Sequence, residues 1–294
     1  MKIGLQIPWF GWDGGPGRTG ENLHRIAEAA DAAGFASIWV MDHLFQIRGV
    51  GKVDDPMFEG YTTLGFLAAC TRRARLGTMV TAATYRHPGL LVKEVTTLDV
   101  LSGGRAWLGI GAGWFEREAL GLGLPFPSLK ERYERLDETL QIARRMWTGD
   151  ASPFQGKHFD LREPLNQPPP LSRPRPPILI GGGGERKTLR LVARYADACN
   201  LFTGAGNQVL AHKLDVLQRH CEGLARDYAE IEKTVLVPAG GADGRLDVGR
   251  LVADCRVWSR MGIQHAILSN VPGQERITPL ETIGRELIPA TAAL

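Results

Sequence analysis

Eight short apolar runs alternate with segments of helical spacing along this chain of 294 residues, and this alternation restricts the possible folds more than any other feature. Apolar runs of this kind are typical of parallel strands that are buried on both faces. They cover residues 2–7, 37–41, 74–80, 105–110, 178–180, 198–202, 234–237 and 264–268. Eight strand–helix pairs without a linker predict a single α/β domain over residues 1–294, a (β/α)8 or TIM barrel. A doubly wound sheet is the alternative.

Residues 149–177 interrupt this alternation before the fifth strand. Residues 154–160 resemble a small hairpin, and the prolines between 164 and 177 predict an extended connector. The segment joins a helix to the following strand, so we expect this insertion on the barrel face opposite the carboxyl ends of the strands. We interpret it as structural.

The charge and the cysteines indicate the environment of the protein. A formal net charge of +3, without a basic block, argues against nucleic acid as a partner. No apolar segment is long enough to cross a bilayer, and the first residues read as a strand and not as a secretory signal. The four cysteines are scattered, as is typical of small core residues in a reducing compartment. We therefore expect a cytoplasmic protein without a membrane partner.

The second apolar run ends in an acid and an imidazole, Asp42 and His43. The carboxyl ends of parallel strands form the rim on which α/β barrels build their active sites. A functional pair is one interpretation. In the other, the acid caps a turn and the histidine only packs the rim. The sequence of this stretch favours neither.

Glycines and aromatic residues follow other strands. Four glycines at 181–184 precede a predicted helix over 185–195, and N–H groups at a helix N-terminus bind anions, so we prefer a phosphate site to a merely tight turn. The alternate glycines at 109–113 leave room for a flat ring. Trp9 belongs to an aromatic loop at 8–15 that either forms a wall for a planar ligand or packs the rim.

Several kinds of catalytic chemistry lack their usual motifs. The sequence has no HExxH motif and no Cys/His cluster, which argues against a metal. It has no GxSxG elbow for a serine hydrolase, and no predicted strand ends in a Schiff-base lysine. A phosphate site, small residues at the strand ends and an Asp-His pair suit redox chemistry by an organic cofactor.

Four pieces of the chain, 39–43, 76–80, 105–113 and 177–184, resemble the bacterial luciferase-like monooxygenase family in their order and motifs. That family consists of flavin- or deazaflavin-dependent barrels. Residues 181–190 and 195–200 are typical of its branch that uses the deazaflavin coenzyme F420. The resemblance implies an oxidoreductase that transfers a hydride between coenzyme F420 and a small organic substrate, usually as a homodimer.

The resemblance also implies roles for individual residues. Asp42 would hydrogen-bond the polar edge of the cofactor ring, and His43 would stand near the hydride-carrying carbon as an acid/base or to orient substrate. Met79 and Val80 would form a non-prolyl cis peptide behind the ring. The other implied cofactor-binding residues are Thr78, Ala82, Gly111, Ala112 and Gly113 around the ring, and Gly182, Gly183, Gly184 and Glu185 at the cofactor tail.

One departure from the family pattern concerns the substrate. The sugar-phosphate dehydrogenases of this branch have a glutamate directly after the strand-four glycines, where this chain has Trp114. Acids follow only at Glu116 and Glu118, so a sugar phosphate is in doubt. We assign Trp9, Trp114 and Glu118 to the substrate pocket. Two alternatives stay open: an FMN-dependent monooxygenase that uses oxygen and a separate partner reductase, and a non-catalytic cofactor-binding protein.

Overall fold

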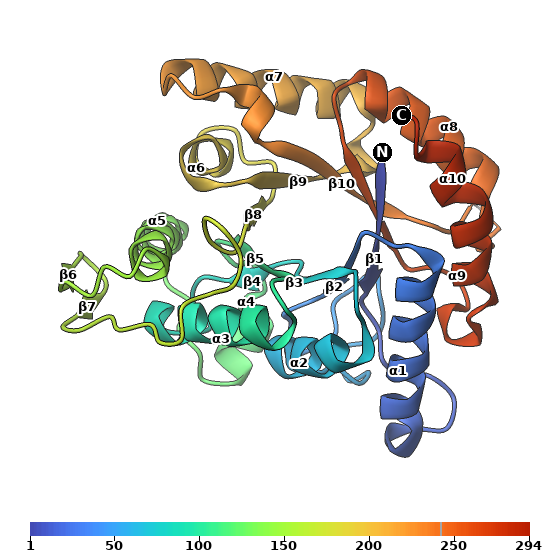
Figure 1. Ribbon diagram of the computed structural model, residues 1–294, viewed down its shortest axis with the longest axis horizontal. Helices are drawn as coiled ribbons and strands as arrows, with labels where there is room; N and C mark the ends of the chain where they lie inside the picture. Colours follow the sequence, from blue (N-terminus) through green and yellow to red (C-terminus); the bar gives the residue numbers. More distant parts are fainter. Residues whose placement is uncertain (242) are drawn as a thin grey trace.

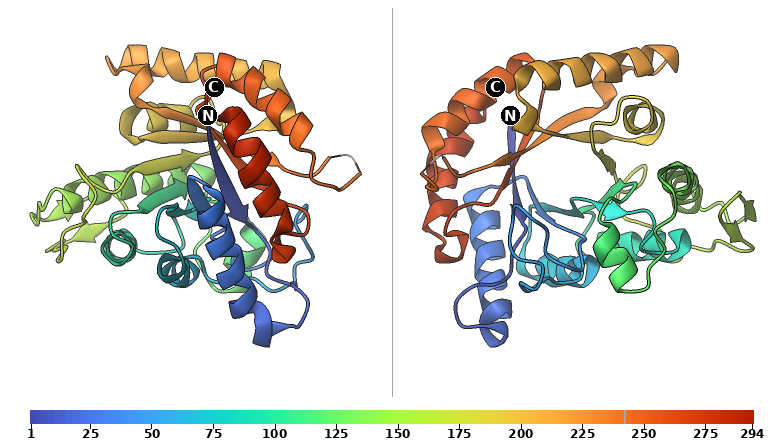
Figure 2. Two further views of the ribbon diagram at one scale, coloured as in Figure 1. Left: turned by 45° about the vertical axis from the view of Figure 1, so that its right-hand side comes forward. Right: turned by 180° about the vertical axis from the view of Figure 1, so that it is seen from behind.

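The computed structural model describes residues 1–241 and 243–294, and its parallel strands close into the predicted barrel (Figures 1 and 2). In ring order the eight strands are β1 (Lys2–Ile7), β2 (Ser37–Val40), β3 (Arg75–Thr78), β5 (Ala106–Gly111), β8 (Ile178–Gly181), β9 (Ala198–Phe202), β10 (Glu232–Pro238) and β11 (His265–Ser269). Pairing of β1 with β11 and of β3 with β5 closes the ring. The two-residue β4 (Thr81–Ala82) pairs with β5 outside it.

The helices surround the strands (Figure 1). They are α1 (Pro16–Ala33), α2 (Gly60–Cys70), α3 (Pro88–Leu101), α4 (Glu116–Gly121), α5 (Leu129–Trp147), α6 (Thr188–Tyr195), α7 (Asn207–Gly223), α8 (Val248–Arg260), α9 (Thr278–Thr282) and α10 (Ile288–Thr291), with a π-helical turn at Ile283–Leu287. The sequence did not predict α4, which is too short to show a period. The last helical segment of the chain is divided into α9, the π turn and α10.

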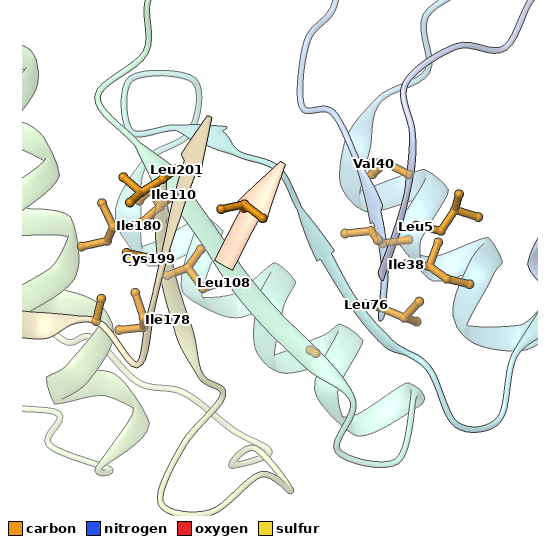
Figure 3. Close-up of a cluster of buried hydrophobic side chains, with 14 of the residues drawn as sticks. Leu5, Ile38, Val40, Leu76, Leu108, Ile110, Ile178, Ile180, Cys199 and Leu201 are labelled. Carbon is orange, nitrogen blue, oxygen red and sulfur yellow. The ribbon is translucent and has the colours of Figure 1, made fainter. Parts of the chain in front are cut away.

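Successive side chains of each strand point alternately into the barrel and toward the helices. Trp39, Trp107 and Leu179 pack together inside the ring. Their chain neighbours belong instead to the larger core between strands and helices, and Figure 3 shows Leu5, Ile38 and Val40 directed toward the first helices. This alternation of side chains along a strand therefore decides which residue at each strand end faces the space above the ring.

The insertion before the fifth ring strand contains the predicted hairpin, β6 (Phe154–Gln155) and β7 (Asp160–Leu161). Figure 1 shows it at the periphery, beyond α5. Backbone N–H groups of the hairpin donate to Glu138 of α5, and the ring of Phe159 packs edge-on against His87, the residue that caps the N-terminus of α3. Helix N-termini follow the carboxyl ends of the strands, so the hairpin reaches the rim side. The expectation of the opposite face was wrong for the hairpin, whereas the connector meets it, because Leu171 and Ser172 donate to Asp99 in the last turn of α3.

The cysteines have the surroundings that the sequence predicts for core residues. Cys199, Cys221 and Cys255 are buried, and Cys70 is half-buried. Over residues 1–241 and 243–294, no helix combines the length and the apolar character needed to span a membrane.

Candidate functional site

A cavity of about 770 Å³ opens at the carboxyl ends of the ring strands, and residues at or shortly after the end of each of the eight strands line it. Its size is within the usual range for small-molecule sites. It is lined by Gln6, 41–43, 79–82, 111–114, 181–184, Asn200, 202–204, Leu236, Pro238, Ser269 and Asn270, together with Ile47–Val50, Tyr85, Tyr133 and Thr188. A larger, more open hollow of about 1100 Å³ around 243–248 and 272–279 contains none of the predicted site residues. We therefore take the cavity as the candidate site.

Most of the predicted residues meet in this cavity. The lining includes Asp42, His43, Met79, Val80, Ala82, Gly111, Ala112, Gly113, Gly182, Gly183, Gly184 and Trp114. Four others lie outside the lining. Trp9 packs its indole beside Gly11, and Thr78 is buried behind the cavity, where its hydroxyl donates to the carbonyl of Gly109. Glu185 pairs with Lys213 and His212, and Glu118 lies behind His43.

One side of the cavity consists of glycines, and we call residues Gly111, Gly113 and Gly181–Gly184 the glycine wall. The peptide bond Met79–Val80 is cis, as predicted. The Val80 side chain occupies the space next to two of these glycines, because a Cβ added to Gly111 or to Gly181 would lie only 3.0 Å from its methyl groups. A larger side chain at either position would displace Val80 or fill the cavity.

The glycine run fits an anionic group, although not in the way that the sequence suggests. Helix α6 begins at Thr188 and not at 185, so the glycines do not open the helix directly. Within residues 1–241 and 243–294, the N–H groups of Gly183 and Gly184 donate to no protein acceptor. The hydroxyls of Tyr133 and Thr188 are hydrogen-bonded to each other at 2.7 Å beside Gly184. These donors could bind a phosphate.

His43 stands on the cavity edge and is held from behind by Glu118. The distance from its Nδ1 to Oε1 of Glu118 is 2.6 Å, and the rings of Trp114 and Phe115 meet the imidazole edge-to-face. Because the carboxylate only accepts, Nδ1 carries the hydrogen, and Nε2 is the nitrogen that is free to act on a ligand. Glu118 was expected in the substrate pocket, but here it fixes the orientation of His43.

Glu118 is a fully buried carboxylate with several donors. Its oxygens accept from the backbone N–H groups of Leu44 and Phe45, at 2.7 and 3.0 Å, from the Tyr85 hydroxyl and from His43. Burial acts to raise the pKa of Glu118, but these hydrogen bonds outweigh it, so that the pKa lies below its ordinary value. The carboxylate is therefore ionised at neutral pH.

The variant Glu118→Gln is expected to lower the free energy of unfolding by about 1–3 kcal/mol at neutral pH, because one amide NH2 replaces an acceptor in this network. Glu118 has its pKa lowered from 4.5 by folding. Its ionic contribution is therefore complete above that value and disappears as the pH falls through the folded pKa. The difference between wild type and variant should shrink below about pH 5 in urea unfolding at a series of pH values. The exposed Glu116→Gln in the same helix is the control, and a difference that is independent of pH would contradict the assignment.

The Asp42 carboxylate is shared with Arg86, a residue that the sequence did not single out. The guanidinium contacts Asp42 bidentately, at 2.5 and 3.0 Å, and also pairs with Glu59 and Glu94. Burial raises the pKa of Glu94 to about 7, with Arg86 opposing it. A carboxylate has about four lone-pair sites. Asp42 therefore keeps the capacity for further donors, and its bond to a cofactor ring stays a prediction.

Sequence reasoning missed a second group of residues at the cavity, the inward-facing ends of β1, β9, β10 and β11. They are Gln6, Asn200, Phe202, Leu236, Pro238 and Ser269. Strand alternation carried through to the last residue of each strand could have found them. Their partners could not have been found locally: Asn200 donates to Thr234 and Ser269 donates to Gln6, 263 residues away in the chain.

Comparisons with known proteins find similar sequences and similar structures for most of the chain. A family model described as luciferase-like monooxygenase matches residues 1–273. An F420-dependent glucose-6-phosphate dehydrogenase of Beutenbergia cavernae is 34% identical over 67% of this chain, but the match covers only 56% of that relative. A relative of the same name from Amycolatopsis mediterranei is 26% identical, covering 92% of this chain and 81% of its own. The solved structure of an F420-dependent secondary alcohol dehydrogenase in complex with an F420-acetone adduct superimposes with a TM-score of 0.81 at 17% identity, covering 99% and 98% of the two chains.

Proposed function

Because the chain belongs to the luciferase-like monooxygenase family, we propose that it is an oxidoreductase that transfers a hydride between coenzyme F420 and a small organic substrate. The observation that carries this proposal is the meeting, in one cavity, of the glycine wall and of a histidine held by a buried carboxylate. Relatives that are named F420-dependent dehydrogenases support the choice of cofactor.

The glycine wall would hold the cofactor. Gly111 and Gly113 leave a flat surface for the ring system, with Val80 behind it. The N–H groups of Gly183 and Gly184 would bind the phosphate of the tail. When bound, coenzyme F420 supplies a carbon that donates or accepts a hydride.

His43 would move the proton that accompanies the hydride. In alcohol oxidation, Nε2 takes the hydroxyl proton while the carbon bearing that hydroxyl gives up its hydride. In ketone reduction, the same nitrogen returns a proton to the oxygen. Glu118 stabilises the imidazolium that forms, because its charge lies 2.6 Å from Nδ1. Tyr85 and the two backbone donors keep that carboxylate in place.

Titration with each cofactor separates the possible functions. We expect saturable binding of oxidised coenzyme F420, followed by its fluorescence, and binding of FMN weaker by at least about tenfold. Tighter binding of FMN would favour the monooxygenase with a partner reductase. Binding of neither cofactor would contradict both proposals.

The variant Gly183→Asp is expected to weaken coenzyme F420 binding by at least about tenfold, because its carboxylate repels the phosphate and fills the approach to the N–H groups. The fold should tolerate it, since a Cβ at Gly183 meets its nearest neighbour, Lys213, only at 3.7 Å. Fluorescence titration gives the affinity, and thermal unfolding tests the fold. Gly20→Asp on the exposed face of α1, where a Cβ meets nothing within 4 Å, is the charge-matched control. An unchanged affinity in a folded Gly183→Asp protein would remove the phosphate assignment.

A further inference from the structure

One part of the cavity outside the glycine wall is apolar. The residues that form it, which we call the apolar wall, are Ile47, Val50, Trp114, Phe202, Leu236 and Pro238. In ring order, β10 and β11 stand opposite β3 and β5, so Leu236 and Pro238 face the cavity from across the ring. Trp114 and Phe202 are 61% and 62% exposed at its mouth. Aromatic side chains this exposed beside a cavity are characteristic of ligand-binding surfaces.

Positive charge is nearly absent from the same lining. Among the described lining residues, Arg48 is the only lysine or arginine, and it is exposed on the turn after β2. The nearby Arg86 does not line the cavity, and its guanidinium is occupied by Asp42, Glu59 and Glu94. A phosphate monoester carries close to two negative charges at neutral pH. It would find one solvent-screened cation here, which contributes little to binding.

The floor of the cavity offers neutral hydrogen-bonding groups instead. Gln6 and Asn200 are almost completely buried, and each has one protein partner: Oε1 of Gln6 accepts from Ser269 at 2.7 Å, and Nδ2 of Asn200 donates to Thr234 at 2.9 Å. The other amide atom of each, Nε2 of Gln6 and Oδ1 of Asn200, has no partner within the described part of the chain and could bind an uncharged polar group. These two amides and His43 can orient one hydroxyl or carbonyl, while the apolar wall receives the rest of the molecule.

We propose that the substrate is an uncharged, mainly apolar alcohol or ketone with a ring-sized body, and not a sugar phosphate. The inference rests on the proposed hydride transfer and specifies what the same cavity accepts. It separates this chain from the relatives named F420-dependent glucose-6-phosphate dehydrogenase. The difference in recognition comes from the apolar wall, where charged side chains would be needed to hold a phosphate.

The test uses the full chain loaded with coenzyme F420 and a panel of compounds: glucose 6-phosphate, glucose, 2-propanol, cyclohexanol, 1-phenylethanol, 1-(2-naphthyl)ethanol and the matching ketones. We expect kcat/KM to rise by about tenfold or more from 2-propanol to the aryl alcohols, and no turnover of glucose 6-phosphate. Calorimetry with the ketones, on loaded and on cofactor-free protein, gives a readout that does not depend on activity. Binding of glucose 6-phosphate tighter than that of every aryl ketone, or binding of none of the aryl compounds, would overturn the proposal.

Variants test whether the apolar wall causes the expected preference for aryl alcohols. Phe202→Ser should raise KM for the aryl alcohols by about tenfold and leave coenzyme F420 affinity unchanged, while Phe202→Leu should restore most of the loss. Phe66→Ser, which removes a 42% exposed phenylalanine from α2 outside the cavity, is the matched control and should change neither quantity. Equal KM values for Phe202→Ser and wild type would contradict the assignment of this wall. Failure of coenzyme F420 to bind wild type is a separate outcome, which contradicts the proposed function, whereas ketone binding to cofactor-free protein still tests the apolar wall.

Discussion

Replacing His43 by alanine is expected to lower turnover by about 10²-fold or more, while the affinity for coenzyme F420 changes little. The imidazole stands at the cavity edge, and its hydrogen bond to Glu118 through Nδ1 leaves Nε2 as the nitrogen that can exchange a proton with a ligand. The glycine wall, which would hold the cofactor, makes no contact that depends on this ring. The loss should therefore fall on kcat and not on cofactor binding.

The fold should survive this substitution, which makes the kinetic result interpretable. Without His43, the Glu118 carboxylate still accepts from the Tyr85 hydroxyl and from two backbone N–H groups. Turnover is measured with the best alcohol of the panel above, and affinity by fluorescence titration. His24→Ala, an exposed histidine on α1, serves as control. Turnover near the wild-type level in both His43→Ala and His43→Asn would remove His43 from the mechanism and leave positioning alone.

Replacing Arg86 by leucine is expected to destabilise the protein by about 3–5 kcal/mol, because it leaves the buried charge of Asp42 without its partner. The side chain of Asp42 is completely buried and that of Arg86 is 11% exposed, so water cannot replace the lost bidentate contact. Loss of the guanidinium also brings the charges of Glu59 and Glu94 to face Asp42 without compensation. Urea unfolding at pH 8, where these carboxylates are most ionised, measures the effect.

Two further variants calibrate this result. Arg145→Leu removes a guanidinium from an ion pair with Asp150 whose side chains are 39% and 40% exposed, and its expected cost is below about 1 kcal/mol. Arg86→Lys keeps the charge but cannot form the bidentate contact, so its stability should lie between the wild type and Arg86→Leu. If Arg86→Leu costs no more than Arg145→Leu, the pairing with Asp42 contributes nothing that the solvent cannot replace.

The barrel was predictable from the sequence because its cause is local. Each buried strand is a short apolar run. A run such as 178–180 can be recognised as a strand from its own residues, without knowledge of the strands beside it. The start of α6 was not predictable in this way. The space beside Gly184 is taken by Thr188 and Tyr133, and Glu185 pairs with Lys213, so the helix begins three residues later than the glycine run suggests.

The partners inside the site were the least predictable part. His43 was found because it follows a strand, but the residue that orients it lies 75 positions away on the unpredicted helix α4. Arg86 is 44 residues from Asp42 and carries no motif of its own. Trp9 was proposed for the pocket from its aromatic loop, yet its ring packs beside Gly11, an outcome that depends on the backbone path. Contacts of this kind are set by tertiary packing and leave no period in the sequence.

Half of the apolar wall comes from a stretch of the chain that contributes nothing to the glycine wall. Every member of the glycine wall precedes residue 185, whereas Phe202, Leu236 and Pro238 of the apolar wall follow it. The segment from β9 to β10 therefore carries half of the apolar wall and no member of the glycine wall. A chimera that takes residues 198–238 from a homologue is expected to change which molecules are accepted and to keep the glycine wall unchanged.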